Sequence, residues 1–237
     1  TTDKDAHLPC TGESVSSSVR GLLLHAWAQA AGDPAAPIAL WFRDGAPADI
    51  RVPMDELDGI MPLVRKDETP DDPSCLETNY ESFTNHGDLE NDPEVLATFK
   101  GFVDAGYLHS CKSLDECKEF LGGELPILNK FACLIKRKWD EKLGDWKIKR
   151  RIIMDSKRSG VKAASRRKFK SVLPRVTDAI SSLMKSLEGC IGSDEEAEQF
   201  VIDATDAFWE LGLHPSERRF FVGKLGGQYL IYLRTAQ

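Results

Sequence analysis

The chain has 237 residues, of which 41% are apolar, so it is long enough to bury a core and to form one large or two modest domains. No segment has the apolar length that a membrane crossing requires, and residues 1–18 lack the basic and apolar blocks of an export signal. Neither export nor membrane insertion is expected, which predicts an intracellular protein, cytoplasmic or nuclear. The six cysteines are scattered without zinc-ligand spacing and are expected to be reduced structural thiols.

The formal net charge of −7 hides a segregation along the chain. Residues 130–175 contain 17 Lys and Arg against four Asp and Glu, so this segment carries +13 and the remainder −20. A basic segment in an acidic protein favours local binding of nucleic acid or nucleotide phosphates. The alternative is a solvated charged face, although such faces usually mix both signs.

Composition and spacing divide the chain into three regions. Residues 1–18 are polar and Ser-rich and are predicted to form a disordered tail. Residues 19–125 are helical and loop-rich. Their clearest helix is capped by Asp92 and ends at Gly106, and a capping box at residues 113–116 opens another.

Residues 126–237 change to a strand-rich pattern. Two strands, 131–135 and 151–154, are joined by a polar turn from Trp139 to Trp146, and a helix that opens at Thr177 or Asp178 follows. A strand at 200–202 comes next, and a hairpin then pairs 219–225 with 228–233 through Gly226 and Gly227. This order predicts an α+β fold.

A pair of acids follows the predicted strand at 200–202. Asp203 would leave the strand end as a ligand for a divalent ion, because Mg²⁺ prefers carboxylate oxygens. The small residues Ala204 and Thr205 would let the backbone approach phosphates, and Asp206 would orient a sugar pocket. Acids three residues apart also cap many helices, so the pair alone leaves that alternative open.

Residues 201–208, followed by 211–215, resemble the first catalytic motif of the reverse transcriptases of gypsy-like and copia-like LTR retrotransposons. Residues 129–138 and 146–157 are similar to the fingers hairpin of that family, and residues 227–237 to the approach to its next motif. These blocks keep the family's order over about half of the chain. The resemblance implies fingers plus an incomplete palm within residues 126–237.

The resemblance also implies roles for individual residues. Asp203 would be the catalytic metal ligand, Asp206 would shape the sugar pocket, and Phe208 would exclude a ribose 2′-hydroxyl unless it is an ordinary core aromatic. The remaining nucleotide contacts would come from Arg151, Lys136 or Arg137, the backbone at Ala204 and Thr205, and Gln237. Template contacts are expected from the basic segment, at Arg150, Lys157, Arg166 and Arg167, although each of these cations could also be solvated without a role.

The chain departs from the family in one respect. The paired-aspartate motif that supplies the other metal ligands does not follow Asp203, and Asp71–Asp72 precedes it between prolines, as in an exposed acidic turn. We therefore expect an incomplete two-ion Mg²⁺ site and an RNA-directed DNA polymerase fragment that is inactive in isolation. Its expected partners are an RNA or DNA template-primer and a deoxynucleoside triphosphate. A non-catalytic nucleic-acid-binding remnant that uses residues 130–175, or a purely structural interaction domain, remains the alternative.

Overall fold

The computed structural model describes residues 7–10, 13–16, 19–54, 71–165, 176–192, 194 and 207–235. The α-helices are α1 (Gly21–Ala30), α2 (Trp41–Asp44), α3 (Pro93–Asp104), α4 (Leu114–Phe120), α5 (Val161–Ala164), α6 (Val176–Gly189) and α7 (Ala207–Glu210). The 3-10 helices are η1 (Ala36–Leu40), η2 (Pro73–Cys75), η3 (Leu89–Asn91) and η4 (Pro215–Phe220). The strands are β1 (His7–Cys10), β2 (Glu13–Ser16), β3 (Leu108–Cys111), β4 (Lys130–Asp140), β5 (Asp145–Asp155), β6 (Val222–Leu225) and β7 (Gln228–Tyr232).

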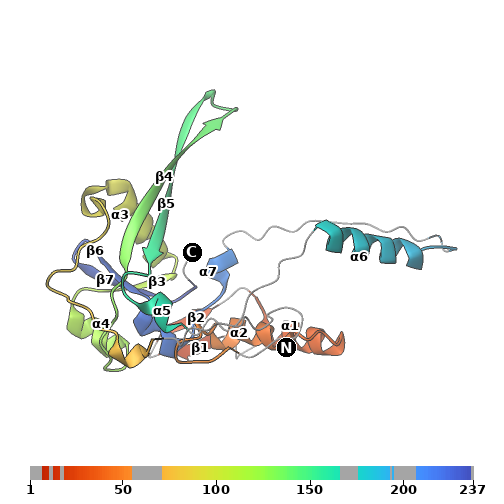
Figure 1. Cartoon of the computed structure of the whole chain (residues 1–237), viewed down its shortest axis with the longest axis horizontal. Coiled ribbons are helices and arrows are strands. Elements are labelled where there is room, and N and C mark those ends of the chain that lie inside the picture. Colours follow the sequence, from red (N-terminus) through yellow and green to blue (C-terminus); the bar gives the residue numbers. More distant parts are fainter. Residues whose placement is uncertain are drawn as a thin grey trace.

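These elements form a mixed α+β protein, as the sequence predicted (Figure 1). The paired strands are antiparallel and make sheets in the orders β1-β2, β3-β7-β6 and β4-β5. None of the helices in the described ranges has the length and apolarity that spanning a bilayer demands.

The three-stranded sheet is built around the predicted Gly-Gly hairpin. Leu225 pairs with Gln228, and Gly226 and Gly227 both have positive φ angles, of 58° and 76°. A two-residue loop that follows the twist of its strands needs this backbone conformation, which glycine adopts without steric cost. The hairpin prediction is confirmed, but β6 begins only at Val222, because the residues before it coil into η4.

The third strand of this sheet comes from the N-terminal half of the chain. β3 pairs antiparallel with β7, with Leu108 opposite Tyr232 and Cys111 opposite Tyr229. The boundary that composition suggested at residue 125 is therefore crossed by one sheet. Residues on both sides of it also pack in one hydrophobic cluster, which joins Phe99 and Leu108 with Phe131 and Leu230.

The helix caps follow the sequence closely. Asp92 Oδ1 accepts the backbone N–H groups of Glu94 and Val95 at 3.0 and 3.3 Å, and Pro93 occupies the first turn of α3. At α4, Ser113 Oγ accepts the N–H of Glu116 at 3.1 Å. Both predicted helix starts are confirmed, since each cap satisfies amides that have no partner within the helix.

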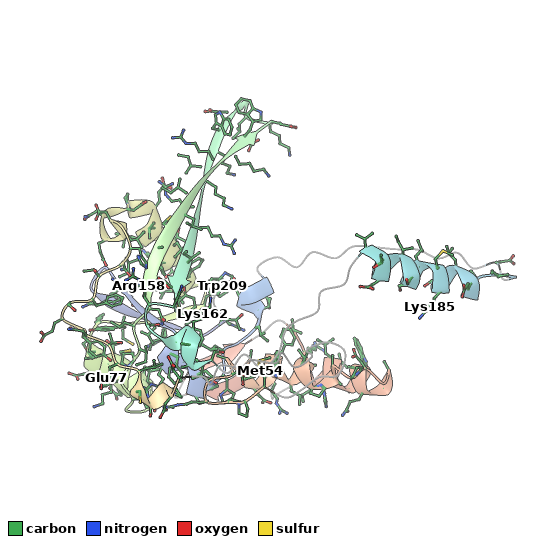
Figure 2. All side chains as sticks on the ribbon, in the orientation of Figure 1. Met54, Glu77, Arg158, Lys162, Lys185 and Trp209 are labelled. Carbon is green, nitrogen blue, oxygen red and sulfur yellow. The ribbon has the colours of Figure 1, made fainter. Side chains whose placement is uncertain are left out.

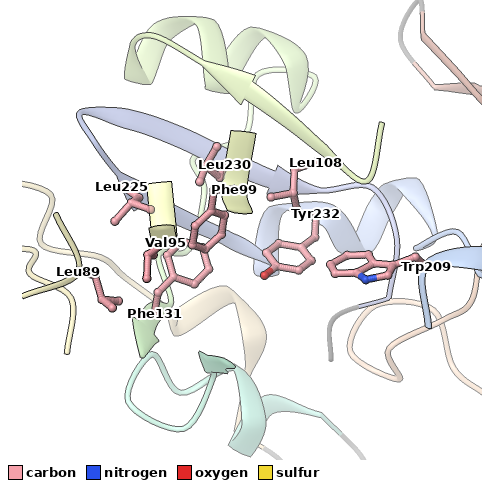
Figure 3. Close-up of a cluster of buried hydrophobic side chains, with 9 residues drawn as sticks. All are labelled: Leu89, Val95, Phe99, Leu108, Phe131, Trp209, Leu225, Leu230 and Tyr232. Atoms are coloured by element: carbon pink, nitrogen blue, oxygen red, sulfur yellow. The ribbon is translucent and has the colours of Figure 1, made fainter. Parts of the chain in front are cut away.

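The main core lies where α3 crosses the sheet and the start of β4 (Figure 3). Phe99 of α3 packs on Phe131 of β4 with ring centroids 4.6 Å apart, and Trp209 stacks on Tyr107 at 4.8 Å. The buried members of this cluster are Leu89, Val95, Phe99, Leu108, Phe131, Trp209, Leu225, Leu230 and Tyr232. Aromatic rings bury a large area and fix their mutual geometry, so this cluster holds the base of β4 rigidly.

β4 and β5 form a ribbon that leaves the body of the protein (Figure 1). Each strand has 11 residues, which at about 3.3 Å per residue gives a length of roughly 35 Å. The predicted strands 131–135 and 151–154 were too short, because the alternation continues through charged residues. The turn is confined to residues 141–144, and Trp139 and Trp146 belong to the strands.

Two other segments differ in part from the sequence prediction. Where a disordered tail was predicted, β1 and β2 pair antiparallel, with His7 opposite Ser16 and Cys10 opposite Glu13. The predicted helix after residue 176 is present as α6, which lies apart from the other elements in Figure 1 and has no buried residue. The predicted strand at 200–202 lies outside the described residues.

Candidate nucleic-acid interface

The β4–β5 ribbon places its cations according to strand alternation. Successive side chains of a strand point to opposite faces, and residues directly opposite each other across the ribbon share a face. One face, called here the cationic face, carries Lys138 opposite Lys147 and Arg151 opposite Leu134, with Lys136 between Leu134 and Lys138 along β4. Figure 2 shows long side chains extending from the ribbon over most of its length.

The cationic face has an unfavourable charge arrangement of its own. Lysines directly opposite each other in an antiparallel pair repel, by an amount of order 1 kcal/mol at most in water and less in salt. The side chains of four cations on this face are exposed, so their charges are accessible to a ligand: Lys136, Lys138, Lys147 and Arg151. A polyanion laid along this face would relieve the repulsion.

The opposite face, called here the tryptophan face, begins in the core and ends in exposed aromatics. Near the base, Cys133, Ile152 and Met154 pack against the main core. At the far end Trp139 lies opposite Trp146, with ring centroids 5.7 Å apart in an edge-to-face arrangement.

Arg150, on the tryptophan face, is held by the first turn of α3. Its Nε lies 3.4 Å from Asp92 Oδ2, and its Nη1 also pairs with the Glu94 carboxylate. Burial raises the pKa of Asp92, but the amides of Val95 and Glu94 and the Arg150 guanidinium together hold it below its usual value. Arg150 therefore braces the ribbon against α3.

A groove of about 940 Å³ opens between α3 and the outer half of the ribbon. Thr98 and Glu94 line it from α3, while Trp139 and Ile148 supply apolar surface and Lys138 and Lys147 supply charge from the ribbon. A volume of this order accommodates a small organic ligand or one nucleotide.

The base of the ribbon carries a smaller hollow of about 440 Å³, lined in part by His86, Asp155, Lys157 and Lys162. Asp155 Oδ2 lies 2.9 Å from His86 Nε2, and Asp155 Oδ1 accepts the amides of Lys157 and Arg158. Burial raises the pKa of Asp155, but these hydrogen bonds outweigh it and hold the pKa below its usual value. This carboxylate therefore fixes the turn after β5, where Lys157 is exposed.

The structure separates the predicted phosphate-binding cations. Arg151 and Lys136 lie on the cationic face, whereas Arg137 lies opposite Ile148 on the tryptophan face. Of the two candidates for assisting Arg151, only Lys136 shares its face.

The predicted catalytic centre is not among the described residues. Asp203, Ala204, Thr205, Asp206 and Gln237 lie outside them, as do Arg166 and Arg167. Phe208 falls in α7, of which only the backbone position is described at that residue. Within the described ranges no three His, Cys, Asp or Glu side chains come together as a metal site.

The sequence prediction missed the tryptophan pair as part of the site. Trp139 and Trp146 were assigned to the turn, although each neighbours an Asp that also pairs across the strands. The sequence has Trp139-Asp140 before the Gly-containing turn and Asp145-Trp146 after it. This symmetric pattern would have predicted that the two tryptophans lie opposite each other.

Comparison with known proteins gives no relative: no protein-family model, no curated protein and no solved structure matches the chain.

Proposed function

We propose that the chain binds nucleic acid along the cationic face of the ribbon, as the fingers and partial palm of a reverse transcriptase of LTR-retrotransposon type. The observation that carries the binding proposal is the row of exposed cations that the register of β4 and β5 assembles. Phosphate contacts by Lys and Arg release counterions and supply most of the sequence-independent affinity for nucleic acid. The polymerase part of the proposal is supported by the resemblance of residues 201–208 and by the hairpin form of the basic segment.

Lys136→Glu should raise the stability of the fold while lowering its affinity for nucleic acid. The described neighbours of Lys136 on the cationic face include Lys138, Lys147 and Arg151, so a glutamate exchanges repulsion for attraction and is expected to stabilise the fold by about 0.2–1 kcal/mol. The same change removes a phosphate contact, so affinity for a labelled oligonucleotide falls and the slope of log K against log salt is reduced by about 0.7 for a single strand.

Lys118→Glu on α4 is the matched control. It makes the same charge change on the body of the protein, away from the ribbon (Figure 1), and is expected to leave the salt slope unchanged. Binding is measured by fluorescence anisotropy at several salt concentrations. Equal losses of affinity in both variants would show that binding depends on net charge alone, and would refute the ribbon as the binding surface.

Primer extension with magnesium and deoxynucleoside triphosphates tests the polymerase part. We expect no extension by this chain and extension by a product of the same gene that also carries paired aspartates, with loss of activity in Asp203→Ala. Oligonucleotide binding by the ribbon should be indifferent to Asp203→Ala. A folded longer product that extends no primer would refute the polymerase assignment and leave a non-catalytic binding module, which the cationic face supports without Asp203.

A further inference from the structure

The far end of the ribbon exposes several large apolar side chains close together, which is unusual on the surface of a globular protein. Trp139 is 47% exposed, Trp146 59%, Ile148 50% and Leu143 in the turn 73%. Contiguous exposed apolar patches on such proteins usually mark a binding surface. The edge-to-face contact of the two indoles stabilises the hairpin but leaves about half of each side chain open to a partner.

The charges around this patch select the chemistry of the partner. The turn and the last strand pair beside it carry Asp140, Glu141 and Asp145 against the single cation Lys142, so the local charge at this end disfavours phosphate. Further down the ribbon, the cationic face attracts phosphate. A partner that fits both parts presents uncharged planar groups to the indoles and phosphates to Lys138 and Lys147, which line the same groove as Trp139.

A single-stranded nucleic acid has that arrangement. Its unpaired bases are free to stack on aromatic side chains while its backbone follows a basic surface. In a duplex the faces of the bases are already stacked, and a ribbon that enters a major groove needs hydrogen-bonding side chains to recognise base edges. Beyond the Ile135–Arg150 pair, the tryptophan face offers mainly indole and aliphatic surface, with Arg137 as its one polar side chain.

The groove between α3 and the ribbon gives room for a base beside Trp139. Its volume of about 940 Å³ exceeds what one nucleotide needs, and Thr98 and Ile148 line it together with the indole. Lys138, Lys142 and Lys147 also line it and can meet the adjoining phosphates. Of its acids, Glu94 pairs with Arg150 and Asp140 accepts the amides of Lys142 and Leu143, while Glu141 reduces the attraction.

We propose that the end of the ribbon is a stacking site for unpaired bases, at Trp139 and Trp146, which makes single-stranded nucleic acid the preferred ligand of this chain. The inference rests on the proposed binding function and adds the class of strand and the residues that select it. The cationic face supplies affinity for any strand, and the indoles supply the preference for an unpaired one.

The test compares the full chain on a labelled oligothymidylate and on a blunt duplex of the same length. The wild type binds the single strand more tightly, and its tryptophan fluorescence is quenched by an unlabelled strand. Trp139→Ala and Trp146→Ala each lower single-strand affinity by roughly 5- to 150-fold, the range for one lost base stack, and change duplex binding little. Their salt slopes stay at the wild-type value, because no phosphate contact is removed.

Two further variants keep the test decisive if the hairpin is weakened. Trp146→Phe keeps an aromatic face and retains most of the preference, whereas Trp146→Leu keeps apolar bulk without that face and loses it. Trp27→Ala is the matched control, since Trp27 is 63% exposed on α1, away from the ribbon in Figure 1. Circular dichroism checks that each variant is folded.

The outcomes separate this inference from the proposal beneath it. Wild-type binding to both ligands with equal affinity, unaltered by the Trp139 and Trp146 variants, would overturn the stacking site and leave the cationic face intact. Equal behaviour of the Phe and Leu variants would also overturn it. Failure of the wild type to bind either ligand at low salt would refute the proposed function itself.

Discussion

Gly223 lies in β6 opposite Leu230, directly against the ring of Phe131 at the base of the ribbon. A Cβ added at this glycine would lie 2.2 Å from Phe131 Cζ and 2.3 Å from Cε2. Carbon atoms in contact normally stay about 3.5–4.0 Å apart. Phe131 is fully buried, with Phe99 4.6 Å away, so its ring has little room to yield.

We therefore expect Gly223→Ala to destabilise the fold. Overpacking of a filled core typically costs about 1–3 kcal/mol. Gly101→Ala is the matched control, because Gly101 is exposed in α3 with no atom within 4 Å of the added Cβ. Alanine loses less backbone entropy on folding than glycine does, so Gly101→Ala should raise the free energy of unfolding by about 0.5–1 kcal/mol.

The same substitution should thus shift stability in opposite directions at the two sites. Urea unfolding followed by circular dichroism gives the free energies, and the melting temperature should move by about 2–4 °C per kcal/mol in a chain of this size. In a double-mutant cycle, Phe131→Leu removes the clashing ring edge and should reduce the cost of Gly223→Ala. Equal stability of Gly223→Ala and wild type, or an unchanged cost when Gly223→Ala is combined with Phe131→Leu, would refute the close-packing argument.

Two further predictions concern buried and paired carboxylates. Glu217 is fully buried, and its Oε1 accepts the backbone N–H groups of residues 50–52 at 2.8–3.3 Å. Glu217→Ala should therefore lower the free energy of unfolding by about 2–4 kcal/mol, and Glu217→Gln by less, because the amide keeps an acceptor. Equal urea midpoints of the two variants and the wild type would contradict this. The Arg51 guanidinium, by hydrogen bonding, holds the pKa of Glu124 below its usual value against the opposing effect of burial. The stabilisation by Glu124 is therefore complete above the unfolded pKa of about 4.3 and is lost as pH falls through the lower folded pKa. Glu124→Gln should flatten the acid limb of the stability curve, and an unchanged limb would show that this pair contributes nothing.

Most local elements of the fold follow directly from neighbouring residues. The Asp92 and Ser113 caps and the Gly226–Gly227 loop each depend on residues within a few positions, and each occurs where the sequence predicted it. The ribbon was only partly predicted, because a run of lysines resembles a polar turn when it is considered without its partner strand. Pairing with β5 shows that the alternation continues to Asp140.

The sequence by itself determined the charge segregation, the helix starts and the Gly226–Gly227 turn, because these depend on composition and on contacts a few residues apart. The tertiary structure decided which cations share a face of the ribbon and that Arg150 pairs with the first turn of α3. It also decided that β3 completes the three-stranded sheet and that Trp139 contacts Trp146 on the protein surface. Each of these depends on the register of strands or on contacts between residues far apart in the chain. A register shift of one residue moves every side chain of a strand to the other face, so composition alone could locate the basic segment but not its binding surface.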